Sequence, residues 1–270
     1  MNLKSIKRRL YADFFRPSKE VEYERIIKTA KEKGYEFHTI LSFEDVLKTG
    51  IDKNKKYLIL RRDIDTADFY ILRKFIEIEK KYGARSTSYF RWNTINTKLM
   101  ADIENVGGES SYHYEEIASF CYQHKIRKKE VAIERMEEIR DLFITNIEKF
   151  RKKTGMNCLT VASHGDYVNT KFQFQNKELM NERVRKEAGI IREAYDSEHM
   201  SALTFRIADQ VEGDNTTTKV IEALERGEHV LEFLTHPRQW NSPICVNLKE
   251  EINRFFKGLY KKGHHSPSPQ

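Results

Sequence analysis

Residues 57–66 read Tyr57-Leu-Ile-Leu-Arg-Arg-Asp-Ile-Asp-Thr66, an apolar run that ends in two acids at alternate positions. Alternate side chains of an extended chain leave the same side, so the two carboxylates lie together. Two like charges side by side are costly unless a cation or a shared proton compensates them. The stretch therefore predicts a buried strand that delivers Asp63 and Asp65 to a metal or catalytic site. The alternative is a strand followed by a helix that Asp65 or Thr66 caps.

The composition is typical of a soluble globular protein with a charged exterior, because 39% of the 270 residues are hydrophobic and 33% are charged. No apolar run is long enough to cross a bilayer, and the basic start of the chain is not followed by the apolar segment of a secretion signal. We therefore expect a cytoplasmic location without membrane insertion. Three widely spaced cysteines predict neither a disulfide framework nor a cysteine zinc site.

The formal net charge of +7 raises the question of nucleic-acid binding. Lys and Arg are scattered among Glu residues, and no basic block is interleaved with aromatic residues. Nucleic acid is therefore not an expected partner. The same positive charge would also attract an anionic sugar or nucleotide sugar.

The rest of the chain alternates between strand-like and helix-like segments. One long helix is predicted over residues 128–153 and a closing helix over residues 248–260. About seven strand and helix units in a single domain over residues 1–260 predict a distorted, incomplete β/α barrel, with a doubly wound sheet as the alternative. Residues 261–270, rich in His, Ser and Pro, are predicted to be a disordered tail.

Further polar clusters follow other predicted strands: His113 with Glu115, His164 with Asp166, and His236. In β/α folds the active site is assembled at the carboxyl ends of several strands, so these side chains could converge with the acid pair. A single histidine at a strand end is more often a surface or hydrogen-bonded residue, and only the shared placement favours a site. The other histidines are interpreted as structural or, in the tail, as adventitious metal binders: His38, His124, His199, His229, His264 and His265.

Five pieces in this order resemble the polysaccharide deacetylase superfamily, the carbohydrate esterases with NodB homology, and most closely a divergent bacterial branch. The pieces are Leu60-Arg-Arg-Asp-Ile-Asp65, Ile78-Glu-Lys-Lys-Tyr-Gly-Ala-Arg-Ser-Thr87 with Tyr89-Phe90, Ser111-Tyr-His-Tyr-Glu115, Ser163-His-Gly165 and Leu234-Thr-His-Pro-Arg-Gln-Trp240. They extend over about two thirds of the chain. The resemblance implies an incomplete β/α barrel with a divalent metal at its mouth.

The resemblance also implies a ligand set for that metal. Asp65 corresponds to the acid that binds the metal, and His113 corresponds to the first histidine of a His-x-x-x-His ligand pair. Ile117 stands where the second histidine is expected, so His164 is the candidate for the third ligand. Such a set suits zinc, with cobalt, manganese, nickel or iron as alternatives.

Roles in catalysis follow from the same resemblance. Asp63 corresponds to the general base, and His236 corresponds to the histidine that donates a proton to the departing amine. Arg62 is expected to hold Asp63 ionised or merely to balance charge, and it is a candidate substrate-binding residue. Tyr112 and Trp240 could line a sugar pocket, with core packing as the alternative for both.

The expected function is metal-dependent removal of an acyl group from an N- or O-acylated sugar or glycan precursor. The alternative is a carbohydrate-binding or glycan-assembly protein that keeps the barrel and has lost turnover. The sequence does not specify the sugar, the acyl group or the oligomeric state.

Overall fold

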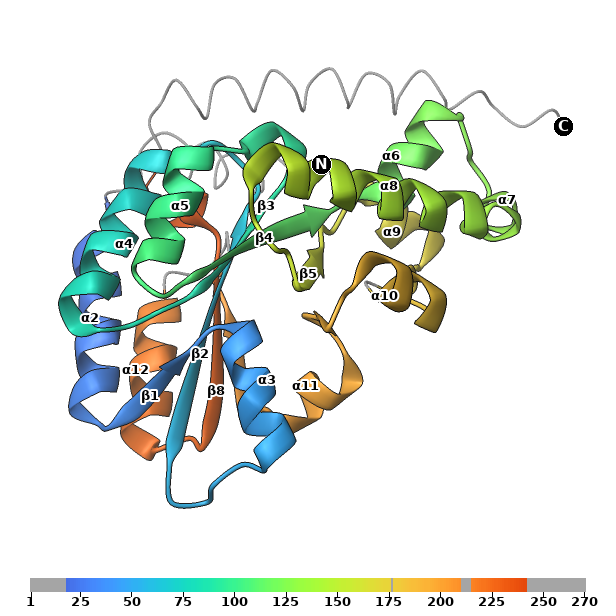
Figure 1. The fold of residues 1–270 in the computed structure, drawn as a ribbon. Helices are drawn as coiled ribbons and strands as arrows, with labels where there is room; N and C mark the ends of the chain where they lie inside the picture. Colours follow the sequence, from blue (N-terminus) through green and yellow to red (C-terminus); the bar gives the residue numbers. More distant parts are fainter. Residues whose placement is uncertain (1–17, 176, 210–214, 242–270) are drawn as a thin grey trace, which may run out of the picture.

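The computed structural model describes residues 18–175, 177–209 and 215–241. Within them, eight strands form one sheet, and every pairing is parallel. The strands are β1 (Tyr35–His38), β2 (Lys56–Ile64), β3 (Thr87–Phe90), β4 (Glu109–Tyr114), β5 (Thr160–Ser163), β6 (Arg192–Glu193), β7 (Phe205–Ala208) and β8 (Val230–Thr235). Seven of them follow the order β6-β5-β4-β3-β2-β8-β7, while β1 pairs with the first half of β2. The sheet curls without pairing β6 to β7, so the predicted incomplete β/α barrel is confirmed (Figure 1).

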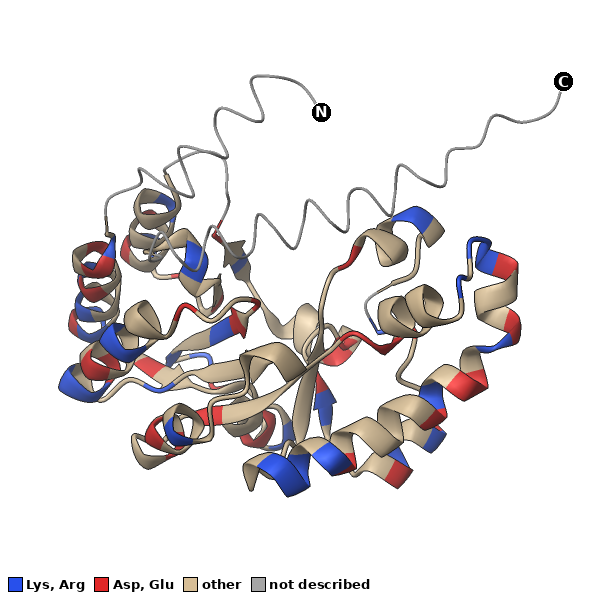
Figure 2. Cartoon of the chain, turned by 90° about the horizontal axis from the view of Figure 1, so that it is seen from above, with Lys and Arg blue, Asp and Glu red and all other residues tan. Residues whose placement is uncertain are grey.

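Most of the helices lie on the outer side of the sheet, whereas α3 packs against its inner side (Figures 1 and 2). The α-helices are α2 (Glu20–Glu32), α3 (Ile40–Thr49), α4 (Phe69–Tyr82), α5 (Thr97–Asn105), α6 (Glu116–Gln123), α7 (Lys129–Glu134), α8 (Met136–Thr154), α9 (Tyr167–Phe172), α10 (Glu182–Ala188), α11 (Ser197–Ala202) and α12 (Thr216–Arg226). Two short 3-10 helices are η1 (Trp92–Thr94) and η2 (Pro237–Gln239). None of the helices in the described part of the chain combines the length and apolar character that a membrane span requires.

Two predicted helices differ from the structure, and one cannot be compared. The long helix expected over residues 128–153 is divided into α7 and α8 at Arg135, whose backbone has φ −103° and ψ 16° and whose guanidinium lies 4.6 Å from the Phe120 ring centre. The helix after the acid pair has Asp68 at its N-cap, so the alternative in which Asp65 or Thr66 caps it does not hold. The closing helix and the tail lie outside the described residues.

Alternation along β2 separates the inside of the barrel from the outside. Tyr57 and Ile59 pack inside, in the apolar cluster to which α3 contributes Ile40 and Phe43. Leu58 and Leu60 pack outside, against α2, α4 and α12. Arg61 and Asp63 therefore share the inner face, while Arg62 shares the outer one.

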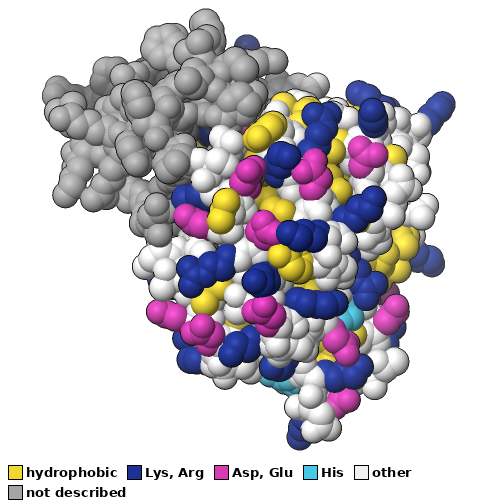
Figure 3. All heavy atoms as spheres, turned by 90° about the vertical axis from the view of Figure 1, so that its left-hand side faces the viewer, with side chains coloured by type: hydrophobic (Ala, Val, Ile, Leu, Met, Phe, Trp, Pro, Cys, Tyr) yellow, Lys and Arg dark blue, Asp and Glu magenta, His cyan; other side chains and the backbone are white. Residues whose placement is uncertain are grey.

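A second outer cluster packs β3 to β5 against α5, α6 and α8. Burial of this apolar surface is the main driving force for folding and holds the strand ends in place. The surface over α2, α4 and α12 carries Lys and Arg side chains interspersed with Asp and Glu (Figure 3). The positive net charge is therefore not gathered into one block on that face.

Candidate active site at the carboxyl rim

Polar side chains lie at the carboxyl ends of the seven strands from β6 to β7, and these ends form one rim of the barrel. The register explains why they share a level: Asp63 pairs with Tyr89 and Tyr89 with Ser111, so Asp65 is level with His113. His113 in turn pairs with Ala162, two residues before His164. The structure therefore brings together five of the predicted site residues: Asp63, Asp65, His113, His164 and His236.

Asp63 is held by an arginine from its own strand. The Arg61 guanidinium donates two hydrogen bonds to it, from Nε to Oδ1 at 3.0 Å and from Nη2 to Oδ2 at 2.8 Å. Burial raises the pKa of Asp63, but Arg61, His113 and His236 lower it by more, so the pKa lies below its usual range. A carboxylate in a bidentate pair of this kind is ionised and fixed in orientation.

Arg62 does not hold Asp63 ionised, and that prediction is wrong. Its guanidinium lies on the outer face, where it forms an ion pair with Glu79 of α4. Glu79 also accepts hydrogen bonds from Tyr23 Oη at 2.5 Å and Ser86 Oγ at 3.0 Å. With 1% of its surface exposed, Arg62 has no access to a ligand at the rim, and we do not propose it as a substrate-binding residue.

Asp65 meets both predicted histidine ligands through one oxygen. His113 Nε2 lies 3.3 Å and His164 Nε2 3.6 Å from Asp65 Oδ1. The two rings lie edge to face with centres 5.2 Å apart. Burial raises the pKa of Asp65, but His113, His164 and His236 lower it by more.

This cluster fits a divalent metal in the chemistry of its donors, and each histidine nitrogen lies close to the Asp65 oxygen. Ligands of one tetrahedral zinc ion lie roughly 3.3 Å apart, given bond lengths of about 2.0–2.1 Å. His113 Nδ1 lies 2.9 Å from the Ala162 carbonyl oxygen, which can accept its proton and leave Nε2 as the metal-binding nitrogen. Asp65 Oδ1 and His164 Nδ1 are buried and have no hydrogen-bond partner among the described residues.

The ring of His164 is suited to the neutral form that metals bind. Burial lowers its pKa to about 4, with Arg91 and His113 acting in the same direction and Asp65 and Glu115 opposing them. Glu115 Oε2 lies 3.6 Å from His164 Nδ1 and accepts a hydrogen bond from Arg91 Nη2 at 2.5 Å. As the side chains stand, no group of three or more His, Cys, Asp or Glu residues in the described chain is arranged to hold a metal ion. The two histidine rings instead lie directly against the Asp65 carboxylate.

His236 is supported by an acid that the sequence did not reveal. Its Nδ1 lies 2.6 Å from Asp209 Oδ1, and its backbone N–H donates to Asp209 Oδ2 at 2.7 Å. Burial lowers the pKa of His236, but Asp209, Asp65 and Asp63 raise it by more, to about 10. The ring is therefore a protonated imidazolium at neutral pH.

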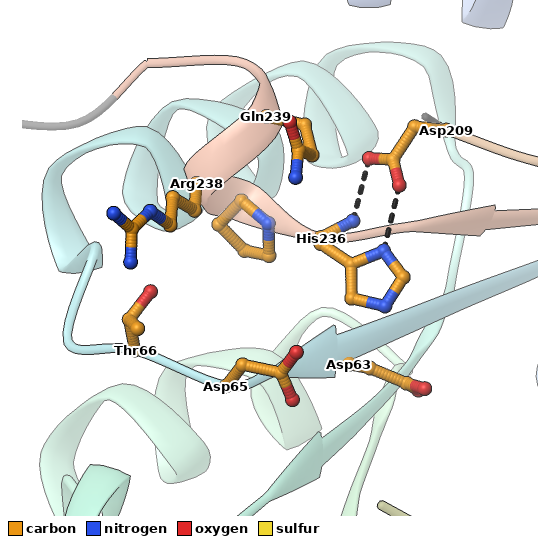
Figure 4. A pocket seen from close by; sticks show the side chains of 8 residues that line it. Asp63, Asp65, Thr66, Asp209, His236, Arg238 and Gln239 are labelled. Carbon is orange, nitrogen blue, oxygen red and sulfur yellow. Dashed lines mark hydrogen bonds and ion pairs between the residues drawn. The ribbon is translucent and has the colours of Figure 1, made fainter. Parts of the chain in front are cut away.

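A pocket of about 300 Å³ opens between the acid pair and this imidazolium (Figure 4). Its lining among the described residues is Asp63, Asp65, Thr66, Asp209, His236, Pro237, Arg238 and Gln239. Figure 4 shows Asp209 and His236 at one end of the pocket and Arg238 and Thr66 at the other. The arrangement places a fixed carboxylate and a charged imidazole around one cavity, as general acid-base chemistry requires.

The two aromatic candidates are core residues. Tyr112 is 1% exposed on the outer face of β4, with its ring centre 4.7 Å from that of Phe150, and its hydroxyl donates to Glu116. Trp240 is 2% exposed and packs edge-on against Tyr23, Phe75 and Phe233. Its Nε1 donates to Asp209 Oδ2 at 2.8 Å, so Trp240 contacts the site through Asp209.

Comparisons with known proteins were made at three levels. No protein-family model matches the sequence, and no curated protein matches it. Solved structures do match, with low TM-scores. The deacetylase PplD of Streptococcus pyogenes in complex with acetate is 18% identical over 59% of this chain and 70% of its own, with a TM-score of 0.39.

Two further solved structures extend over more of the chain. A CE4 family pseudoenzyme from Bacillus anthracis is 15% identical over 78% of this chain, with a TM-score of 0.39. The match spans 63% of that pseudoenzyme, which is less than two thirds of its length. The peptidoglycan deacetylase PdaC from Bacillus subtilis is 12% identical over 80% of this chain and 100% of its own, with a TM-score of 0.34. By their descriptions these three structures are two deacetylases and a CE4 family pseudoenzyme.

Proposed function

We propose that the protein is a metal-dependent hydrolase that removes an acyl group from an N- or O-acylated sugar or glycan precursor. The observation that carries the proposal is the pairing of opposite proton-transfer groups around one pocket. The Asp63 carboxylate is bound at both oxygens by Arg61, and the His236 ring is bound at Nδ1 by Asp209, which raises the pKa of His236. Hydrolysis of an amide or ester needs a group that takes a proton from water and a group that gives one to the leaving atom.

Asp65, His113 and His164 would hold the metal in this proposal. When bound, a divalent ion, zinc or alternatively cobalt, manganese, nickel or iron, supplies Lewis acidity to an acyl carbonyl and to water. The fit is supported by the buried Asp65 Oδ1 and by the carbonyl of Ala162, which orients His113.

The chain's own residues carry the proton transfers. Asp63 accepts a proton from water as the water attacks the acyl carbon, and Arg61 keeps that carboxylate ionised and fixed in orientation. His236 donates its Nε2 proton to the nitrogen or oxygen of the sugar as the acyl bond breaks. Asp209 holds the ring through Nδ1, which leaves Nε2 to act. A cytoplasmic location belongs to the same proposal.

The test is acetate release by the full-length protein loaded with zinc or cobalt. The probes are an N-acetylated chito-oligosaccharide and nitrophenyl acetate. We expect release by the wild type and a loss of about 100-fold to 10,000-fold in both Asp63→Asn and His236→Gln. The matched control is His229→Gln, since the His229 ring lies against the Asp52 carbonyl and the Tyr57 ring, before the start of β8 and away from the rim.

The outcomes separate the two functions. Release that survives Asp63→Asn contradicts the proposed base. No release by the wild type, together with binding of the chito-oligosaccharide that Asp63→Asn leaves unchanged, identifies a carbohydrate-binding protein instead.

A further inference from the structure

The open side of the barrel is bridged by side chains where strand pairing is missing. Tyr195 follows β6 and meets Arg206 of β7, whose guanidinium carbon lies 5.5 Å from the Tyr195 ring centre. Arg206 Nε donates to Glu232 Oε1 of β8 at 2.7 Å. Glu232 Oε2 lies 2.7 Å from His199 Nε2 of α11. These four side chains, which we call the seam, connect β6, β7, β8 and α11.

Two of the four side chains of the seam, Glu232 and His199, lie in the protein interior. Both are fully buried, so the hydrogen bond between them is costly to break. Tyr195 is held from the other side, because its backbone N–H donates to Glu193 Oε2 at 2.6 Å. Glu193 also accepts from the backbone N–H of Ser163 at 3.0 Å and is itself fully buried. The backbone of Tyr195 is thus anchored to a buried carboxylate, and its side chain is half-buried.

Tyr195 also contacts Arg61, the arginine that binds the proposed catalytic base Asp63. Arg61 Nη2 donates to Tyr195 Oη at 3.1 Å, and the Arg61 guanidinium carbon lies 4.5 Å from the Tyr195 ring centre. The same guanidinium carbon also lies 5.5 Å from the ring centre of Tyr89. Cation–π contacts and one hydrogen bond therefore position the guanidinium that makes both bonds to Asp63.

We propose that Tyr195 is a positioning residue for Asp63, acting through Arg61. Asp63 lines the pocket and Arg61 binds both of its oxygens, while Tyr195 contacts the same guanidinium through its hydroxyl and its ring. The seam thereby contributes to catalysis. Through Arg206 of β7 and His199 of α11, it helps to hold Tyr195, and so to orient the Asp63 carboxylate. The inference rests on the proposed role of Asp63 as general base.

A purely structural Tyr195 would only tie β6 to β7. Its loss would then lower stability and leave Asp63 in place. A positioning Tyr195 predicts a defect in the reaction step at saturating substrate, because a misdirected base slows the chemistry without weakening ground-state binding. The two roles differ in kcat and in the orientation of Asp63.

The experiment compares wild type, Tyr195→Ala and Tyr195→Phe as full-length, zinc-loaded proteins. Tyr195→Phe keeps the ring and removes the hydroxyl, and it serves if Tyr195→Ala does not fold. The matched control is Tyr35→Phe, which removes a tyrosine hydroxyl that donates at 2.8 Å to the Glu228 carbonyl. Crystal structures and steady-state kinetics with the N-acetylated chito-oligosaccharide are the two measurements.

We expect kcat to fall about 100-fold in Tyr195→Ala and by a smaller factor in Tyr195→Phe, with KM within about twofold of the wild type. Zinc content should match the wild type in both variants, and Tyr35→Phe should retain full kcat. The crystal structure of Tyr195→Ala should show the Asp63 carboxylate without its two bonds to Arg61.

An unchanged kcat in Tyr195→Ala, or an Asp63–Arg61 pair that keeps its wild-type geometry there, overturns the inference. If Tyr195→Ala does not fold, the same two criteria apply to Tyr195→Phe. A wild type that releases no acetate is instead a failure of the proposed function. In that case the crystal structures alone decide whether Tyr195 positions Asp63.

Discussion

His236 Nδ1 and Asp209 Oδ1 lie 2.6 Å apart at the ends of the neighbouring strands β8 and β7. The same carboxylate accepts the backbone N–H of His236 and the indole N–H of Trp240 through Oδ2. Asp209 is therefore fixed by three contacts, one of which is an ion pair with the imidazolium. This relationship makes His236 a proton donor at neutral pH and allows its role to be tested separately from the metal.

The pH dependence of hydrolysis should show the effect of Asp209. Because the pKa of His236 is raised to about 10, the proton donor stays charged until the pH approaches that value. In Asp209→Asn the main group that raises the pKa is lost, so it should fall toward about 6.5. We expect the alkaline limb of the pH–rate profile to move to lower pH by more than one unit. An NMR titration of the His236 ring gives the same comparison without substrate, and an identical midpoint in both proteins would contradict the assignment.

Stability should depend on pH through the same pair. The pKa of His236 is higher in the folded protein, about 10, than in the unfolded chain, about 6.5. The pair therefore stabilises the fold fully below about pH 6.5, and this contribution is lost as the pH rises toward 10. Urea unfolding of wild type and Asp209→Asn should show a stability difference that narrows over this interval. A difference that is constant from pH 6 to 10, with Asp141→Asn as the surface control, would argue against the raised pKa.

The buried ion pair on the outer face predicts a large loss of stability when one partner is removed. Glu79→Ala leaves the Arg62 guanidinium, 1% exposed, without its counter-charge, which should cost about 3–5 kcal/mol. Glu77 lies on the same helix, 64% exposed and 2.9 Å from Lys74 Nζ, and Glu77→Ala should cost less than about 1 kcal/mol. Chemical denaturation measures both. Equal losses of unfolding free energy in Glu79→Ala and Glu77→Ala would contradict a buried Arg62 that depends on Glu79 for its counter-charge.

The sequence predicted the parts of the site that follow strong strand signals. Asp63 and Asp65 come at the end of a buried strand and stand out against the apolar run that begins it, whereas His113 comes near the end of a buried strand of mostly polar residues. Parallel strands bring their carboxyl ends to one rim, so their meeting follows from topology. His164 and His236 were predicted from strand-end position together with the family resemblance. The barrel was predicted from the alternation of strands and helices over the whole chain.

Two predicted substrate-binding residues lie on the wrong face for a simple reason. Arg62 and Tyr112 are direct neighbours of Asp63 and His113, and neighbours in a strand point to opposite faces. Strict alternation would have selected Arg61, two residues before Asp63, as the arginine that shares its side. The outward positions of the Tyr112 ring and the Arg62 guanidinium follow from this alternation of side chains along a strand.

Asp209 was harder to predict from sequence. The strand before it, β7, has three of its four residues only partly buried, so it lacks the apolar pattern of the central strands. An acid after such a segment is indistinguishable from a surface turn. Tyr195 is hidden for a related reason, because β6 has only two residues.

Metal content of the full-length protein tests the central claim most directly. All proteins carry His264→Ala and His265→Ala, which removes adventitious metal binding by the tail. Metal content of this background protein is compared with that of three variants made in it: Asp65→Ala, His113→Ala and the control His229→Ala. We predict about one divalent ion per chain in the background and in the control, and a loss of that ion in Asp65→Ala and in His113→Ala. Metal that is retained in both variants, or no metal in the background protein after loading with zinc, would contradict the proposed site.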